Sequence, residues 1–169
     1  MASRSKTAVV FKEAFGQKIN RFARIHGIWR TGQIAAKTST AVAELIPLLA
    51  DEDEEIMAQT LKVLGDIKYK AAENQVLPLL AHQNLRIQFF TSQALGRFKS
   101  QAAIEPLLKV IERNEDKDLY LRHDGVVALS RIGAETQAVA LVNHESKALR
   151  TAAVLVLRRL KSAKIADFL

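Results

Sequence analysis

The residue types that most often carry catalysis or metal binding are few and scattered in this chain of 169 residues. The four histidines, at 26, 82, 123 and 144, have no metal-ligand spacing such as H-E-x-x-H. The chain has no cysteine, which excludes thiolate zinc sites, a cysteine nucleophile and disulfides within it. Residues 27–33, GIWRTGQ, approach the glycine spacing of a phosphate-binding loop, but Gln33 stands where that loop needs lysine and no strand precedes it. We therefore expect no catalytic residue, no metal ligand and no cofactor.

Positive charge is the stronger chemical signal. The net charge is +7, and residues 1–40 hold eight basic residues against one acidic residue. Arg97, Arg131 and Arg159 recur at similar intervals, so they form one row if the chain repeats. Such a row suits a phosphate backbone or an acidic protein surface. The plainer interpretation is a solvated face on which the arginine stems cover apolar neighbours.

Trp29 is the only tryptophan, and it stands beside Arg30. Both residue types are favoured at interface hot spots. The alternative is that Trp29 packs under an N-terminal helix around residues 9–15. The candidate interaction surface comprises Arg24, Trp29, Arg30, Arg97, Arg131 and Arg159.

A second polar cluster consists of Asp118, Tyr120, Arg122 and His123. Asp118 precedes Arg122 by four residues, the spacing at which a carboxylate and a guanidinium meet across one helical turn. We expect this cluster to fix the turn that precedes it, with a ligand site as the alternative.

An internal repeat must position these residues. Five segments align without gaps, at 23–34, 56–67, 87–98, 121–132 and 149–160. We number each segment from its second residue as position 0. Apolar residues flank the segment at positions −1 and 10, and mostly small or apolar residues stand at positions 3, 4, 6 and 7, which is one broad helical face. Position 8 reads Gly32, Gly65, Gly96, Ser130 and Arg158, and position 9 reads Gln33, Asp66, Arg97, Arg131 and Arg159.

A second apolar segment follows each aligned segment, so the repeating unit is a helical hairpin. Pro47 and Pro78 stand at the same register of two second helices, where the missing N–H should bend the helix. Polar turns separate the hairpins, and their acidic residues are expected to cap the following helices.

A single hairpin of this kind cannot bury its apolar face, so hairpins must stack. The sequence predicts an all-α fold, a right-handed α-solenoid of about five hairpins. We expect one domain over 1–169, with repeats near 21–50, 54–82, 85–114, 119–143 and 147–169 after an N-terminal helical extension over 1–20. The second helices are expected to line a concave surface.

The pattern resembles the HEAT family in its short bacterial form, the PBS-lyase-like HEAT repeat. RIHGIWRTGQI (24–34), IQFFTSQALGRF (87–98) and DLYLRHDGVVAL (118–129) are also similar to the HEAT segment of bacterial membrane-bound dehydrogenase-like proteins, which join a propeller, a HEAT array and a cytochrome c domain. Arg30, Thr31 and Arg158 depart from that group, and the haem motif C-x-x-C-H is absent, so any redox activity implied by the resemblance lies outside these residues.

Three functions follow as hypotheses. The first is a non-enzymatic scaffold that binds a protein or the neighbouring domains of a larger, haem-containing parent. The second is a nucleic-acid-binding array, and the third is a chromophore-lyase-like helper. No apolar run is long enough to insert into a membrane. If the resemblance to dehydrogenase-like proteins holds, it implies that the protein is located in the periplasm. Without that context we expect the cytoplasm. The apolar last segment suggests a domain excised from a longer protein, or an array whose end a partner covers.

Overall fold

The computed structural model describes residues 10, 12–35 and 39–168, and every regular element within them is helical. The all-α prediction is therefore confirmed. Residues 12–16 are helical and Phe15 is buried, whereas residues 1–9 of the expected N-terminal extension lie outside the described part.

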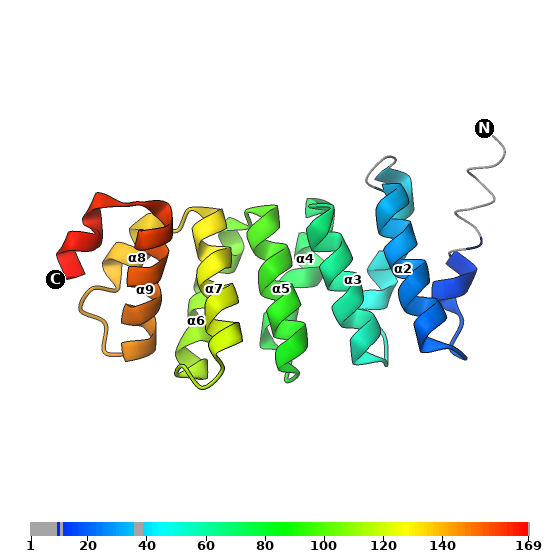
Figure 1. Ribbon diagram of the computed structural model, residues 1–169, viewed down its shortest axis with the longest axis horizontal. Helices are drawn as coiled ribbons and strands as arrows, with labels where there is room; N and C mark the ends of the chain where they lie inside the picture. The colour runs from blue at the N-terminus through cyan, green and yellow to red at the C-terminus, as the bar shows by residue number, and fades with distance from the viewer. Residues whose placement is uncertain (1–9, 11, 36–38, 169) are drawn as a thin grey trace.

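Five long helices, here called the first helices, coincide with the aligned segments. They are α2 (Arg21–Ala35), α3 (Glu54–Asp66), α5 (Leu85–Phe98), α7 (Leu119–Ile132) and α9 (Lys147–Leu160). Shorter second segments follow them: η1 (Ser39–Ala50), η2–α4–η3 (Lys70–Ala72, Glu73–Val76 and Leu77–Ala81), η4–α6 (Gln101–Ala103 and Ile104–Asn114), α8 (Glu135–Ala140) and η5 (Ala163–Phe168). The hairpins stack into an elongated row of two layers (Figure 1).

Side chains in the polar turns begin the first helices, as the acidic turns predict. Asp53, Asn84 and Asp118 accept hydrogen bonds from backbone N–H groups of the first turns of α3, α5 and α7, and Ser146 does the same for α9. Each cap satisfies donors that the helix itself leaves unpaired.

Loss of one cap should therefore destabilise the array measurably. Asp118 accepts from the N–H groups of Tyr120 and Leu121 at 2.8 and 2.9 Å. We expect Asp118→Ala to lower the free energy of unfolding by about 1 kcal/mol and the Tm by roughly 2–4 °C. Thermal unfolding followed by circular dichroism measures this, with Glu112→Ala on exposed α6 surface as control. Equal Tm values for the two variants would contradict the capping role.

The two prolines act as the sequence predicts, but more strongly. Pro47 lies inside η1 and Pro78 in the first turn of η3, and both segments are 3₁₀ helix rather than bent α-helix. A proline removes one N–H and clashes with the preceding turn, which disfavours α-helical bonding there. Both second segments that contain these prolines therefore depart from regular α-helix.

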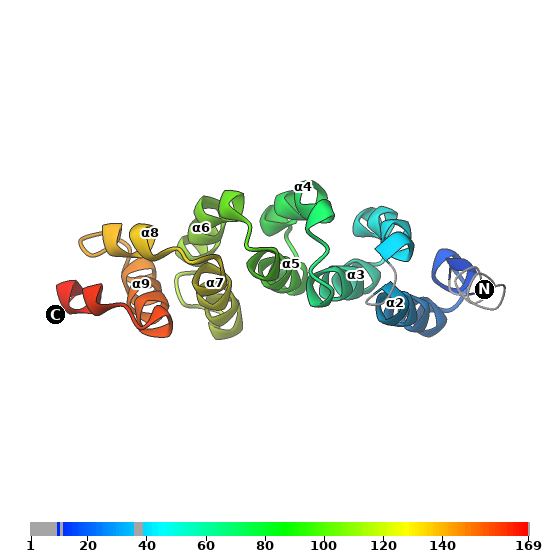
Figure 2. The ribbon, with the colours of Figure 1, turned by 90° about the horizontal axis from the view of Figure 1, so that it is seen from above.

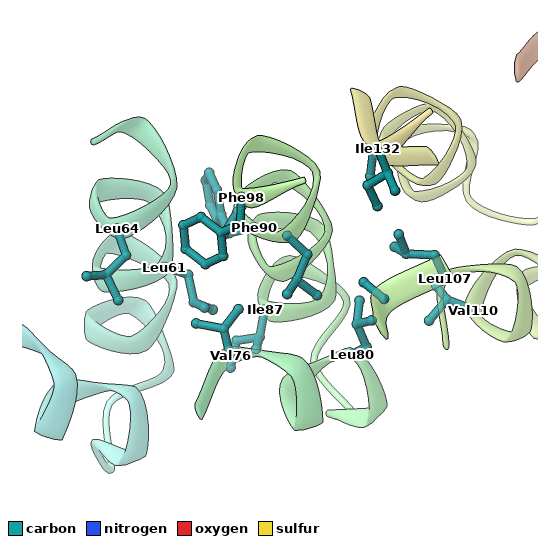
Figure 3. Close-up of a cluster of buried hydrophobic side chains, with 14 of the residues drawn as sticks. Leu61, Leu64, Val76, Leu80, Ile87, Phe90, Phe98, Leu107, Val110 and Ile132 are labelled. Carbon is teal, nitrogen blue, oxygen red and sulfur yellow. The ribbon is translucent and has the colours of Figure 1, made fainter. Parts of the chain in front are cut away.

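The core lies between the two layers. Figure 3 shows Leu61 of α3, Val76 of the second segment and Ile87 of α5 gathered between the layers, whereas Leu80 of the same second segment lies near Leu107 of α6. Leu61, Leu64, Val76 and Ile87 are fully buried. The apolar face of each hairpin is thus completed by its neighbour, as expected for a repeat array.

Small residues let the first helices approach one another closely. A Cβ on Gly96 would lie 2.7 Å from the Ala128 Cα, and one on Gly65 would lie 3.0 Å from the Ala94 Cα. In both cases position 8 of one first helix faces position 6 of the next. The α3–α5 and α5–α7 pairs accordingly pack extensively, whereas second segments of successive repeats touch only slightly.

This difference sets the curvature. Figure 2 shows the row bowed gently, with the second segments on the outer side and the first helices on the inner side. The expectation that the second helices line the concave surface is therefore wrong. The closely packed layer becomes the inner one, and its small residues at positions 6 and 8 place the first helices there.

Candidate interaction surface on the inner layer

One row of side chains on the first helices, which we call the concave face, includes the exposed Trp29, Gln33, Asp66, Arg131 and Arg159. It is formed mainly by positions 5 and 9. The position-5 residues are Trp29, Lys62, Gln93, Val127 and Leu155, and the position-9 residues are Gln33, Asp66, Arg97, Arg131 and Arg159.

Trp29 occupies the N-terminal part of this face. Its ring is 40% exposed, its Nε1 donates to Gln59 Oε1 at 2.8 Å, and it meets the His26 ring edge-on at 5.4 Å. Gln59 is held in turn by Glu55 at 2.7 Å. The ring is therefore fixed in place while part of it remains open to solvent.

An open pocket of about 560 Å³ lies beside this ring, between α2 and α3. It is lined by Trp29, Gly32, Gln33, Lys62, Val63, Asp66 and Ile67. Val63 and Ile67 supply an apolar floor, and Lys62 and Asp66 form an ion pair of 2.7 Å at its rim. We call this the Trp29 pocket.

The three arginines of position 9 lie along the same face. Arg97 pairs with Asp66 at 3.0 Å, across the α3–α5 interface. Arg131 and Arg159 are exposed. Partial burial, together with the neighbouring charges of Arg97 and Arg159, lowers the pKa of Arg131, and the nearby Asp124 opposes this shift. Arg131 therefore lies close enough to both other guanidinium groups to be repelled by them.

Arg24 does not belong to this surface, so its assignment as an exposed interaction residue is corrected. It is 6% exposed, donates to the Phe15 carbonyl at 2.9 Å and binds both carboxylate oxygens of Asp51. Arg24 bridges the segment before α2, through the Phe15 carbonyl, and the turn after η1, through Asp51, and this position between two segments buries it. Arg30 is exposed on α2 and donates to Gln33 at 2.7 Å.

The structure reveals one buried charge on this face that the sequence did not single out. Asp124, at position 2 of α7, is 5% exposed and accepts from Gln93 Nε2 at 3.3 and 3.4 Å. Burial raises its pKa, and the Gln93 bond and the nearby positive charges of His123, Arg131 and Arg97 oppose that rise. A polar residue at position 2 also occurs in α3, where Gln59 receives Trp29. That shared position was the available signal.

The raised pKa makes Asp124 a source of pH dependence. A carboxyl group whose pKa is higher in the folded state than its ordinary value of 3.8 favours folding when it is protonated. This stabilisation is complete at pH values below 3.8 and is lost as the pH rises through the folded pKa. We expect Asp124→Asn to have a higher Tm than the wild type at pH 7, with the difference closing near pH 3.5. Glu112→Gln, an exposed control, should show no such pH-dependent gap. A lower Tm for Asp124→Asn at pH 7 would show that the charged form contributes favourably.

The cluster at the start of α7 is structural in arrangement, with one correction. Asp118 caps the helix, and Asn114 closes the preceding turn by bonding the Asp118 backbone at 2.8 and 3.0 Å. Arg122 pairs with Asp116 at 3.2 Å rather than with Asp118, because the cap directs the Asp118 carboxylate to the backbone. Tyr120 is 79% exposed and His123 is exposed, and neither is drawn into the cluster.

Within the part of the chain that the structure describes, no group of three or more His, Cys, Asp or Glu side chains is arranged to hold a metal ion. None of the helices described there is both long and apolar enough to cross a membrane.

Comparisons with known proteins agree with this geometry. A search of curated proteins returned no significant match. Among solved structures, the chain is similar to the complex of CpcE and CpcF of phycocyanin lyase from Nostoc sp. PCC7120, with a TM-score of 0.71, 20% identity, and coverage of 90% of this chain and 64% of that one. It thus spans under two thirds of that chain. It is also similar to an engineered protein, with a TM-score of 0.60, 15% identity, and coverage of 96% of this chain and 85% of that one.

A sequence-family model extends the agreement from fold to family. The model for HEAT repeats matches residues 42–130, which is more than half of the chain and includes the first helices α3 and α5 and most of α7. The position-8 glycines Gly65 and Gly96 and the buried apolar residues of α3 and α5 fall within that range. The chain therefore belongs to the HEAT repeat family.

Proposed function

We propose that this chain is a non-enzymatic scaffold whose concave face binds another protein or a neighbouring domain of a longer parent chain. The observation that carries the proposal is the unbroken inner layer. The first helices α2, α3, α5, α7 and α9 present a fixed aromatic ring, an open apolar pocket and a row of arginines on one side. Solenoids use such extended concave surfaces for binding.

Two features of the site support a protein as the occupant. The Trp29 pocket is apolar at its floor, and tryptophan and arginine are enriched among residues that dominate protein interfaces. The resemblance to membrane-bound dehydrogenase-like proteins makes a haem-containing neighbour in the periplasm one form of this proposal.

Nucleic-acid binding is the second candidate, and the row Arg97, Arg131 and Arg159 favours it. Phosphate contacts release counterions, so affinity for duplex DNA should fall steeply as salt rises. A titration at two salt concentrations tests this, and no binding at the lower one excludes it. Asp66, paired with Arg97, and the Glu55 carboxylate lie on the same layer and weigh against a long phosphate track.

Chromophore attachment, suggested by the name of the phycocyanin lyase structure, is not favoured over the scaffold. At 20% identity that likeness concerns the fold alone. A change in the spectrum of a pigment on mixing with this chain would support chromophore attachment instead.

Site-specific photo-crosslinking in cells tests the scaffold proposal. A photoreactive residue replaces exposed His123 on the inner layer, and in a matched variant it replaces exposed Glu112 on α6 of the outer layer. We expect covalent capture of a defined protein, or of a domain of the same parent chain, from position 123 and not from position 112. Capture from position 112 alone, or of nucleic acid from position 123, would overturn the proposal.

A further inference from the structure

We propose that the concave face takes an extended acidic segment of a partner protein, with one apolar side chain in the Trp29 pocket and carboxylates opposite Arg131 and Arg159. This inference rests on the proposed scaffold function and specifies the chemistry of its partner. It follows from three properties of the face: the pocket, the distribution of charge and the distance between them.

The Trp29 pocket is built to receive an apolar group. Its volume of about 560 Å³ lies within the usual range of binding pockets, and Val63 at 6% exposure forms part of its floor. The Trp29 Nε1–Gln59 bond and the Gln59–Glu55 bond fix the ring before any ligand arrives. A side chain that enters the pocket therefore gains apolar contact without ordering the ring, which favours affinity.

Positive charge without a carboxylate partner is concentrated at the α7 and α9 end of the concave face. Three cations of the first half each have a carboxylate partner: Lys62 and Arg97 share Asp66, and Arg86 pairs with Glu55. Among the described residues, neither Arg131 nor Arg159 forms an ion pair with a carboxylate, and both are exposed. Asp124, the acid nearest to Arg131, is buried and bonded to Gln93.

An acidic ligand would relieve this imbalance. The positive charges of Arg97 and Arg159 act unfavourably on Arg131, and a carboxylate placed between Arg131 and Arg159 would offset the repulsion between those two while it forms charge-assisted hydrogen bonds. Arginine suits this role because its planar fork binds a carboxylate in a bidentate manner.

The spacing of the first helices sets the register of the ligand. Packed helices lie about 8–10 Å apart, so α7 lies roughly 16–20 Å beyond α3, which borders the pocket. An extended chain advances about 3.3–3.6 Å per residue. The apolar residue and the carboxylate opposite Arg131 should therefore be separated by about five or six residues, with a second carboxylate about three residues further on, opposite Arg159.

A synthetic peptide tests this directly, because Trp29 is the only tryptophan of the chain. The probe carries one leucine, five uncharged polar residues, and two glutamates three residues apart, and it contains no aromatic residue. A second probe has the reverse order, since the face does not fix the direction of the chain. We expect one of the two to change Trp29 fluorescence saturably, and to bind more weakly as salt rises.

Matched variants separate the two halves of the site. Leucine-to-serine substitution in the peptide and the double variant Arg131→Glu/Arg159→Glu in the protein should each weaken binding by at least about tenfold. Lys109→Glu/Arg113→Glu on exposed α6 changes the charge equally and should leave binding unchanged. Circular dichroism establishes that the variants remain folded.

Each outcome decides the proposal. A fluorescence change that depends on both the leucine and the two arginines supports it. Failure of both peptides to bind at low salt, or equal weakening by the α6 variant, overturns it. Tighter binding of a duplex oligonucleotide that is abolished by Arg131→Glu/Arg159→Glu assigns the arginines to nucleic acid instead. Capture of a protein partner from position 123 alongside silent peptides would leave the scaffold function standing and remove only the acidic segment.

Discussion

Replacing Arg24 with alanine is expected to lower the free energy of unfolding by about 3–5 kcal/mol, because it leaves a carboxylate partner unpaired in a largely buried setting. The side chains of Arg24 and Asp51 are 7% and 12% exposed, and the guanidinium also satisfies the Phe15 carbonyl. Asp51 in turn accepts from the Asp53 N–H at 2.9 Å, at the start of α3. The variant therefore loosens the junction between the first two hairpins as well as an ion pair.

The same pair predicts a change with pH. The hydrogen bond from Arg24 lowers the pKa of Asp51 against the opposing effect of burial. A lowered folded pKa contributes stability above the ordinary value of 3.8, and that contribution is lost as the pH falls through the folded pKa. The Tm of the wild type should thus fall more between pH 5 and pH 3 than that of Arg24→Ala.

Lys12→Ala is the matched control for this prediction. Lys12 pairs with Glu44 at 2.8 Å, but both side chains are largely exposed. An exposed pair contributes about 0–1 kcal/mol, so this variant should unfold close to the wild type. Equal decreases in the free energy of unfolding of the two variants, measured in urea, would show that the Arg24–Asp51 pair stabilises the fold no more than an exposed ion pair does.

Gly96→Leu should destabilise the array by about 3 kcal/mol and lower the Tm by roughly 6–12 °C. A Cβ at this position would lie 2.7 Å from the Ala128 Cα, so the obstacle is backbone and cannot rotate away. The α5 and α7 axes must separate, which loosens the most closely packed part of the inner layer. Intrinsic helix propensity points in the opposite direction, since leucine exceeds glycine by nearly 1 kcal/mol within a helix.

Gly16→Leu controls for the change of residue type. A Cβ on Gly16 meets nothing within 4 Å, so this substitution should leave the Tm unchanged or raise it slightly. Thermal unfolding of both variants, followed by circular dichroism, makes the comparison. An unchanged Tm for Gly96→Leu would mean that the helices are not held at the separation this packing requires.

Much of the fold can be predicted from the sequence because the repeat is regular. The five aligned segments predict the first helices closely, and Asp53 and Asp118 predict where two of them begin. Periodic apolar positions and capping residues act locally, so a single sequence is sufficient to identify them. The prolines predicted bends in the second helices but not their 3₁₀ geometry.

The features that escaped prediction depend on which neighbours meet. The inner layer is set by contacts between position 8 and position 6 of successive hairpins, and the segment alignment does not reveal which layer packs more closely. The burial of Arg24 depends on the turn at Asp51, 27 residues away. Arg122 bonds Asp116 because Asp118 is already engaged by the backbone. Asp124 is buried because α5 covers it with Gln93.

A bound partner should cover the inner layer of the array and leave the outer layer open. Hydroxyl-radical footprinting compares the free protein with the protein bound to the partner captured by cross-linking, and reports on individual side chains. We expect binding to protect Trp29 and Leu155 on the inner layer and to leave the reactivity of Leu79 and Leu108 on the outer layer unchanged. Protection of Leu79 and Leu108 with Trp29 and Leu155 still reactive would contradict it.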